Sequence, residues 1–364
     1  MNRQSWSSLK KWSLRILGFI LMLICICLLI IWYYSPGETR PMTDKDGKLI
    51  PNSIAIIEKP ILEGIPQSLI IRGENVENPI LLFLHGGPGT PEFPFIKETF
   101  RDLESVFTIC YWDQRGAGKS YTDKSETITL EQLVKDGGAV SQYLIEKFDQ
   151  PKIYILGHSW GSFLGSFMVN KYPNLFHAYL GTGQVANQYD SEVLSYQFTA
   201  NEAAARFDEA AIEIIKNTPL PDINDETEIW FNYMQVNRKY VGMYGGATYE
   251  PQPISDIIKA YLFCEEYTFS DKINTIKGAI ESFKLLWKPV MEYNLIEDLK
   301  EQPVPVYIFQ GKHDYQTTYR YAKEYYDSLK APIKQFYPFE KSAHTPMIEE
   351  YDIFKQIIQD DILK

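Results

Sequence analysis

One stretch, residues 153–169, most constrains how this chain can fold. It opens with the apolar run Ile153–Leu156, turns through Gly157–Gly161 (Gly-His-Ser-Trp-Gly) and continues as an apolar segment of helical character that lasts until Pro173. Strand, sharp turn and helix in this order form the context that a nucleophilic serine in Gly-x-Ser-x-Gly requires. The flanking glycines suit a tight, strained turn, because side chains there would clash. The pattern predicts that the Ser159 hydroxyl is raised into a cleft, at the positive end of a helix.

The pentapeptide alone also fits an ordinary strand-to-helix turn, so its interpretation depends on the rest of the chain. Apolar runs that predict strands alternate with helical segments, which indicates a mostly parallel α/β sheet with helices on both faces. The predicted strands are Ser53–Ile57, Ser68–Ile71, Ile80–Leu84, Val106–Tyr111, Ile153–Leu156, His177–Leu180, Pro303–Phe309 and Gln335–Phe339.

The alternation stops over residues 186–301, which are rich in helix formers and aromatic residues. Because this stretch lies between two strands of one sheet, we expect a helical cap over the carboxyl edge of the strands, where ligands bind in open α/β folds. The helices of an ordinary second domain are the alternative. The core is then formed by residues 53–185 and 302–364, preceded by a polar tether, 38–52.

Residues 1–37 predict a cytoplasmic stub followed by a transmembrane anchor. No charged residue occurs from Ile16 to Gly37, a stretch long enough to cross the ~30 Å hydrocarbon layer, and Ile16–Ile31 is almost wholly aliphatic. Basic residues precede the run and aromatic residues flank it, which favours a single pass through the cell membrane with the remainder outside. The alternative is a cleaved signal peptide, but the run is long for one and no Ala-x-Ala-like site follows it.

Charge and cysteine content narrow the class of protein further. The formal net charge is −11, and the segment before Glu38 holds four basic and no acidic residues, so the outer part is distinctly acidic and a nucleic-acid partner is not expected. The four cysteines lack metal-type spacing and are too few for a disulfide framework. We expect buried free thiols, with a Cys110–Cys264 disulfide as the minor alternative.

A serine hydroxyl needs a base to remove its proton and an acid to orient that base. Among the five histidines, His344 lies in a loop after the last predicted strand, and Asp314 follows the Pro303–Phe309 strand. The order Ser159, Asp314, His344 is typical of α/β-hydrolases. Taken singly, Asp314 could be a helix N-cap and His344 a surface residue. Together the three predict a catalytic triad.

The oxyanion of a tetrahedral intermediate needs backbone N–H donors. We expect one from Trp160, which follows the nucleophile, and one from the loop His85–Gly89 (His-Gly-Gly-Pro-Gly), from Gly87 or alternatively Gly86. Glycine there lets the backbone approach the substrate closely.

Three motifs together resemble the prolyl iminopeptidase branch of the α/β-hydrolases, from about Ile57 to the C-terminus. They are His85–Gly89, Asp113–Ser120 (Asp-Gln-Arg-Gly-Ala-Gly-Lys-Ser) and Gly157–Ser162. The resemblance implies an aminopeptidase that removes N-terminal residues, often proline, from small peptides without metal or organic cofactor. It also implies acidic cap residues that bind the substrate amine, for which Glu266 and then Glu265 are the candidates.

The chain departs from that family at His158, where glycine is usual, and at Tyr315, where some members have a second acid. The N-terminal anchor is also unusual for peptide processing inside the cell. Two other functions therefore stay open: an esterase or amidase of the same fold acting on small acyl substrates, and a non-catalytic binding protein. The sequence leaves the oligomeric state undetermined.

Overall fold

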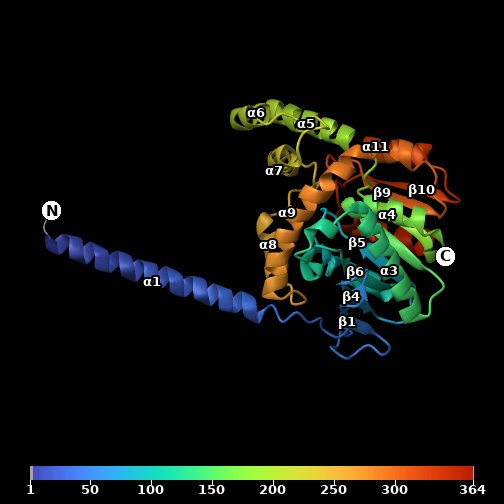
Figure 1. Cartoon of the computed structure of the whole chain (residues 1–364), viewed down its shortest axis with the longest axis horizontal. Coiled ribbons are helices and arrows are strands. Elements are labelled where there is room, and N and C mark those ends of the chain that lie inside the picture. Colours follow the sequence, from blue (N-terminus) through green and yellow to red (C-terminus); the bar gives the residue numbers. More distant parts are fainter. Residues whose placement is uncertain (1–2, 364) are drawn as a thin grey trace.

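The computed structural model describes residues 3–363, which form a twisted sheet covered by helices, with one long helix projecting away from it (Figure 1). The sheet has eight strands in the order β1-β4-β6-β5-β7-β8-β9-β10. These strands are β1 (Ile54–Glu58), β4 (Ser68–Gly73), β5 (Ile80–Leu84), β6 (Thr108–Asp113), β7 (Ile153–His158), β8 (Phe176–Thr182), β9 (Val306–Gly311) and β10 (Lys334–Phe339). A small hairpin, β2 (Ile61–Leu62) and β3 (Ile65–Pro66), lies outside it.

The six strands from β6 to β10 in the sheet order run parallel, and β4 and β1 continue the sheet antiparallel. Both faces of the sheet are buried at β5, so successive side chains of this strand enter different cores: Leu82 and Leu84 one, Leu81 and Phe83 the other. This explains the continuous apolar runs and confirms the predicted fold class.

Helices cover both faces of the sheet. One core contains residues of α3 (Leu130–Phe148), α4 (Trp160–Lys171) and α11 (Tyr319–Ser328), and the other contains residues of α2 (Phe93–Ile96) and α13 (Tyr351–Ile357). The remaining short segments are α12 (Pro346–Glu349), the 3₁₀ turns η1 (Thr99–Arg101), η2 (Leu103–Ser105), η3 (Gly118–Ser120), η4 (Ser125–Thr127) and η5 (Pro173–Leu175), and the π turn η6 (Ile358–Ile362).

Two glycines in the middle of α3 serve the packing of α3 against α4. A Cβ on Gly137 would lie 2.5 Å from Sδ of Met168, and one on Gly138 would lie 2.6 Å from the Tyr172 ring. The helix therefore continues through both glycines, although their low helix propensity suggested a weak point. Thr129 is the N-cap of α3, and its side chain accepts a hydrogen bond from the Gln132 N–H.

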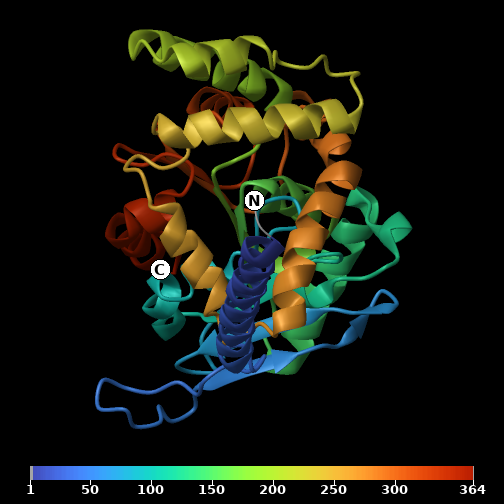
Figure 2. The same ribbon diagram turned by 90° about the vertical axis from the view of Figure 1, so that its left-hand side faces the viewer.

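The predicted cap stretch carries six helices between β8 and β9 (Figure 2). They are α5 (Gln188–Ala205), α6 (Glu209–Lys216), α7 (Thr227–Met243), α8 (Ile254–Leu262), α9 (Phe269–Glu292) and α10 (Leu295–Asp298). The capping box of Thr268 and Asp271 starts α9. Pro289 lies inside α9, close to its end at Glu292.

Helix α1 (Arg3–Tyr33) projects away from the folded part, and its segment Trp12–Tyr33 is long and apolar enough to cross a membrane. None of that segment is buried against the protein. Cys25 and Cys27 are consequently exposed on α1, contrary to the expectation of buried thiols, whereas Cys110 and Cys264 are buried and free. The alternative of a disulfide between the last two is therefore wrong.

A buried ion pair joins the turn after β6 to α3. Nε and an Nη of Arg115 donate to the two oxygens of Asp136 over 2.6 and 2.7 Å, and the same Nη donates to the Glu63 carbonyl. Both charged side chains are almost fully buried. Removal of one partner would leave the other charge in the core without compensation.

We expect Asp136→Ala to lower the free energy of unfolding by about 3–5 kcal/mol, because Arg115 would remain buried and unpaired. Denaturant unfolding of the full chain in detergent measures this change. The matched control is Glu202→Ala, which removes a pair with Arg206 that is about half exposed and should cost under about 1 kcal/mol. Equal losses in the two variants would contradict the prediction.

Candidate active site

Ser159 occupies a strained turn between β7 and α4. Its φ of 54° and ψ of −121° are unusual for a residue with a side chain. The glycines on either side permit close backbone contacts: a Cβ on Gly157 would lie 2.3 Å from the Gly161 carbonyl oxygen, and one on Gly161 would lie 2.0 Å from that of Leu84. The motif thus folds as predicted, with Ser159 at the N-terminal end of α4.

Asp314 and His344 come from the loops after β9 and β10 and lie in contact. Nδ1 of His344 is 2.9 Å from Oδ2 of Asp314, and both side chains are buried. Oδ1 of Asp314 also accepts hydrogen bonds from the backbone N–H groups of Gln316 and Thr317. Burial alone would raise the pKa of Asp314, but the charge and hydrogen bond of His344 and these N–H donors lower it below its usual value.

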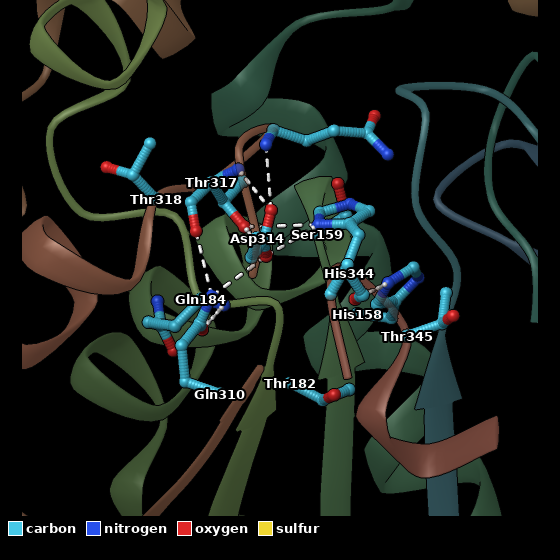
Figure 3. A network of polar contacts seen from close by, with 12 residues as sticks. His158, Ser159, Thr182, Gln184, Gln310, Asp314, Thr317, Thr318, His344 and Thr345 are labelled. Atoms are coloured by element: carbon cyan, nitrogen blue, oxygen red, sulfur yellow. Dashed lines mark hydrogen bonds and ion pairs between the residues drawn. The ribbon is translucent and has the colours of Figure 1, made fainter. Parts of the chain in front are cut away.

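The ionised Asp314 therefore holds the proton on Nδ1 of His344 and leaves Nε2 free to act as a base. Figure 3 shows Ser159 beside the His344 ring, although no hydrogen bond joins the Ser159 hydroxyl to that ring in the described structure. Such bonds are often long in enzymes without substrate and tighten when it binds. The structure thus brings all three predicted residues to the same edge of the sheet.

A cavity of about 50 Å³ lies over Ser159. Gly87 and Trp160, the two expected oxyanion donors, line it, and neither backbone N–H donates a hydrogen bond to another described residue. Gly87 has a φ of 118°, which favours glycine. The alternative donor, Gly86, does not line this cavity; a Cβ on it would lie 2.8 Å from Oε1 of Glu92 and 3.2 Å from Cβ of Ser159.

Gln114, from the motif Asp113–Ser120, fixes the loop that carries Gly87. Its side chain donates to the His85 carbonyl and accepts from Nε1 of Trp160, while its N–H donates to Nε2 of His85. Nδ1 of His85 lies 2.9 Å from the Gly86 carbonyl, so His85 is neutral with the proton on Nδ1. Burial lowers the pKa of His85 to about 4. His85 is therefore a structural residue of the loop.

His158 and Glu92 form a buried pair below His344, which the sequence analysis did not find. Nδ1 of His158 lies 2.7 Å from Oε1 of Glu92. Its Nε2 lies 3.0 Å from the His344 carbonyl (Figure 3). A carbonyl only accepts, so Nε2 carries a proton. Burial lowers the pKa of His158, but the Glu92 charge and hydrogen bond outweigh it, and the pKa is raised. His158 is the residue that departs from the family's usual glycine.

Residues of the cap helices complete the cavity, and the sequence analysis did not identify them as site residues. Gln188 of α5, Met234 and Arg238 of α7 and Trp287 of α9 all line it. Arg238 pairs with the fully buried carboxylate of Glu192. No motif marks these positions, because they are adjacent only after the cap helices pack together.

Glu265 and Glu266 lie elsewhere. They line a separate pocket of about 580 Å³ that does not include Ser159. Glu265 pairs with Arg40 of the tether, and the buried Glu266 pairs with Lys97 over 3.1 Å. With both carboxylates occupied in another pocket, the structure argues against the expected role of these residues in binding a substrate amine.

No group of three or more His, Cys, Asp or Glu residues that could hold a metal ion occurs in the described part of the chain. The chemistry that the site can perform with its own residues is nucleophilic attack by a hydroxyl, proton transfer by an imidazole and stabilisation of an oxyanion by two N–H groups.

Comparisons with known proteins agree with this geometry. Residues 79–351 match the family described as alpha/beta hydrolase fold. The probable aminopeptidase YbaC of Bacillus subtilis is 33% identical over 306 residues, which cover 83% of this chain and 94% of the relative. A proline iminopeptidase of Lactobacillus crispatus is 24% identical, over 79% of this chain and 92% of that protein.

Among solved structures, a proline iminopeptidase of Mycobacterium smegmatis has a similar fold, with a TM-score of 0.59 at 17% identity. The match covers 84% of this chain and 96% of that one. From the family match, the length of the match to the probable aminopeptidase and the site's geometry, we conclude that this chain is a hydrolase of the α/β-hydrolase family, in the branch that resembles the proline iminopeptidases.

Proposed function

We propose that this chain is a membrane-anchored serine aminopeptidase that removes the N-terminal residue of small peptides through an acyl-enzyme intermediate. The observation that carries the proposal is the Asp314–His344 pair beside Ser159, which is held in a strained turn under a cavity. The names of the relatives, probable aminopeptidase and proline iminopeptidase, support the choice of substrate class.

In the proposed mechanism, Oγ of Ser159 attacks the scissile carbonyl carbon while Nε2 of His344 takes its proton. The oxyanion binds the N–H groups of Gly87 and Trp160. His344 then gives the proton to the leaving amine, and the carbon–nitrogen bond breaks to leave an ester on Ser159. A water molecule, activated by the same imidazole, hydrolyses this ester. Asp314 stays ionised throughout and orients His344.

Gln188 is proposed to bind the substrate's free amine in place of Glu265 and Glu266. Its Nε2 donates to Glu192 and to the Gln316 carbonyl, which fixes the orientation of the amide. Its Oε1 is buried without a hydrogen-bond partner and belongs to a residue that lines the cavity. An unpaired buried acceptor is costly, so a donor such as an ammonium group would be favoured there.

A second candidate function is hydrolysis of small acyl esters or amides without a free amine. Arg238 favours it, because this cation lines the cavity next to Ser159 and suits a carbonyl or carboxylate oxygen of a substrate. Glu192 neutralises much of that charge, which leaves the aminopeptidase as the first choice.

The anchor in this proposal is α1. At ~1.5 Å per residue, Trp12–Tyr33 would extend ~33 Å, enough for a hydrocarbon core of ~30 Å. The basic residues before it favour an N-terminus in the cytoplasm and a hydrolase domain outside the cell. A signal sequence would contain a similar apolar helix, so the topology is part of the proposal.

We expect the full chain in detergent to hydrolyse prolyl and alanyl arylamides and to react with a fluorophosphonate probe at Ser159. Ser159→Ala should lower kcat/KM by at least about 10⁴-fold and abolish labelling, because it removes the hydroxyl that forms the acyl-enzyme in the proposed mechanism. Ser328→Ala, an exposed serine on α11, is the control and should change neither. Activity that survives Ser159→Ala would exclude this mechanism, and a folded chain that neither labels nor turns over would favour a binding protein.

N-acetylation of the same arylamides should raise KM, since it removes the ammonium that Gln188 Oε1 is proposed to accept from. Gln188→Met, which keeps the length but not the acceptor, should raise KM for free-amine substrates by about tenfold and leave acetylated ones unchanged. Steady-state kinetics on the paired substrates measure both effects. If acyl esters and acetylated substrates are hydrolysed as fast as free-amine substrates, this result would support the second candidate instead.

The pH dependence follows from the charges around His344. The general base must be neutral, so kcat/KM should fall as pH drops through the range where histidine takes up a proton, near ~6.5 for an ordinary imidazole. The pKa of Asp314 is lowered, so this carboxylate keeps its charge as pH falls through this range. The pKa of His158 is raised, so His158 takes up its proton at higher pH than an ordinary imidazole. The acid limb should therefore not report protonation of Asp314.

Glu92→Gln removes the charge that raises the pKa of His158. We expect kcat to fall by about 10–100-fold, because the His344 loop loses a charged support, with little change in KM. The loss should grow towards alkaline pH, where His158 gives up its proton in the variant before it does so in the wild type. A pH-independent loss would mean that Glu92 acts only through packing. The control is Glu98→Gln, which leaves the His158 pair intact.

A further inference from the structure

The C-terminal end of α1 is fixed against the turn between cap helices α8 and α9. The Tyr34 ring packs edge-on against Phe263 at 5.5 Å between centroids. The buried Lys272 of α9 donates a 2.6 Å hydrogen bond to Oγ of Ser35, directly after the helix. Figure 2 shows α8 and α9 on either side of α1. These contacts set the orientation of both cap helices relative to α1.

Both helices expose apolar side chains. Ile273, Ile276 and Ile280 of α9 are 41%, 66% and 41% exposed, and their spacing of three and four residues places them on one face of the helix. Ile257 and Ile258 of α8 are 42% and 50% exposed, and Phe263 follows at 46%. We call these six residues the α8–α9 apolar face. Exposed apolar groups of this size mark sites of contact with another apolar surface, here next to the C-terminal end of α1.

The inner side of α9 packs on the loops of the active site. A Cβ on Gly278 would lie 2.1 Å from the Gly116 carbonyl oxygen, and the Ser282 side chain lies where a Cβ on Gly89 would be. Trp287, further along the helix, lines the cavity over Ser159. The exposed apolar residues of α9 therefore do not belong to the substrate cavity, and whatever covers them lies outside the enzyme.

We propose that the α8–α9 apolar face lies in the interfacial layer of the bilayer that α1 crosses. This inference rests on the membrane span of the proposed function. The bilayer is the surface that covers this face, because α1 leaves the membrane at Tyr33 and is fixed directly afterwards between α8 and α9. The exposed faces of these two helices are thereby held against the lipid surface. Trp32, Tyr33 and Tyr34 are the aromatic residues expected at that level.

Burial of isoleucine and phenylalanine side chains in the acyl boundary stabilises such contact by roughly 25 cal/mol per Å² of apolar surface removed from water. The cap would then be held on two sides, by the membrane outside and by the active-site loops inside. Helix α9 carries both part of the α8–α9 apolar face and Trp287 of the cavity wall. The position of the bilayer would therefore influence the shape of the cavity.

The test uses the full chain with Cys25→Ser and Cys27→Ser, which removes the two exposed thiols and leaves Cys110 and Cys264 buried. A nitroxide is attached at Ile276→Cys or Ile258→Cys after reconstitution into vesicles of phosphatidylethanolamine and phosphatidylglycerol. The matched control is Ile333→Cys, an isoleucine 52% exposed that precedes β10, at the end of the sheet opposite the cap. Power-saturation EPR compares access of oxygen, which concentrates in lipid, with access of a water-soluble nickel chelate.

We expect labels at Ile276 and Ile258 to favour oxygen in vesicles and the label at Ile333 to favour nickel. A chain that stays in the vesicles after alkaline carbonate washing, but whose Ile276 label is as open to nickel as the Ile333 label, would overturn the docking and leave the span intact. Spin–spin broadening at Ile276 with poor access of both reagents would overturn it in favour of a second copy of the chain. Release of the chain by carbonate would overturn the span and the docking together.

Discussion

The approach of α4 to the end of β5 is the constraint on which the rest of the site depends. Gly161 touches the Leu84 carbonyl so closely that a Cβ would lie 2.0 Å from the oxygen. The turn that allows this contact forces Ser159 into a φ of 54°. The strained residue persists because buried strands on both sides over-determine its position. One packing contact thus places the hydroxyl, the start of α4 and the glycine loop after β5 within a few ångströms of each other.

Polar groups around this turn form hydrogen-bonded pairs that fix the orientation of each side chain. Gln114 connects His85, the glycine loop and Trp160, so the two oxyanion donors share one support. On the other side, His158 joins Glu92 to the His344 carbonyl. The His158 imidazole lies between two acceptors, and the Glu92 charge outweighs the cost of burial and raises the pKa of His158. The site therefore contains two histidines with different roles: His344 as the base, and His158 as a support of the His344 loop.

The cap helices line the cavity over Ser159 together with the active-site loops. They close this small cavity, whose unpaired acceptor, Gln188 Oε1, and paired cation, Arg238, are the groups that would select a substrate. The same cap receives the end of α1 through Lys272 and Phe263. In the proposed function, one group of helices would therefore both select the substrate and receive the membrane anchor, and α9 packs this group against the active-site loops.

Local patterns determined the sheet, the order of the strands along the chain, the nucleophile turn and the acid and base loops, because each depends on short-range rules: apolar runs for buried strands, glycine where the backbone must come close, and polar residues just after strand ends. The tertiary structure alone decided which charges meet. Glu266 looked like an amine ligand in sequence, yet it faces Lys97 in another pocket, whereas Glu92 and Gln188 reach the site from distant segments. Pairing between charges far apart in sequence depends on how the cap helices pack, and no local pattern encodes that packing.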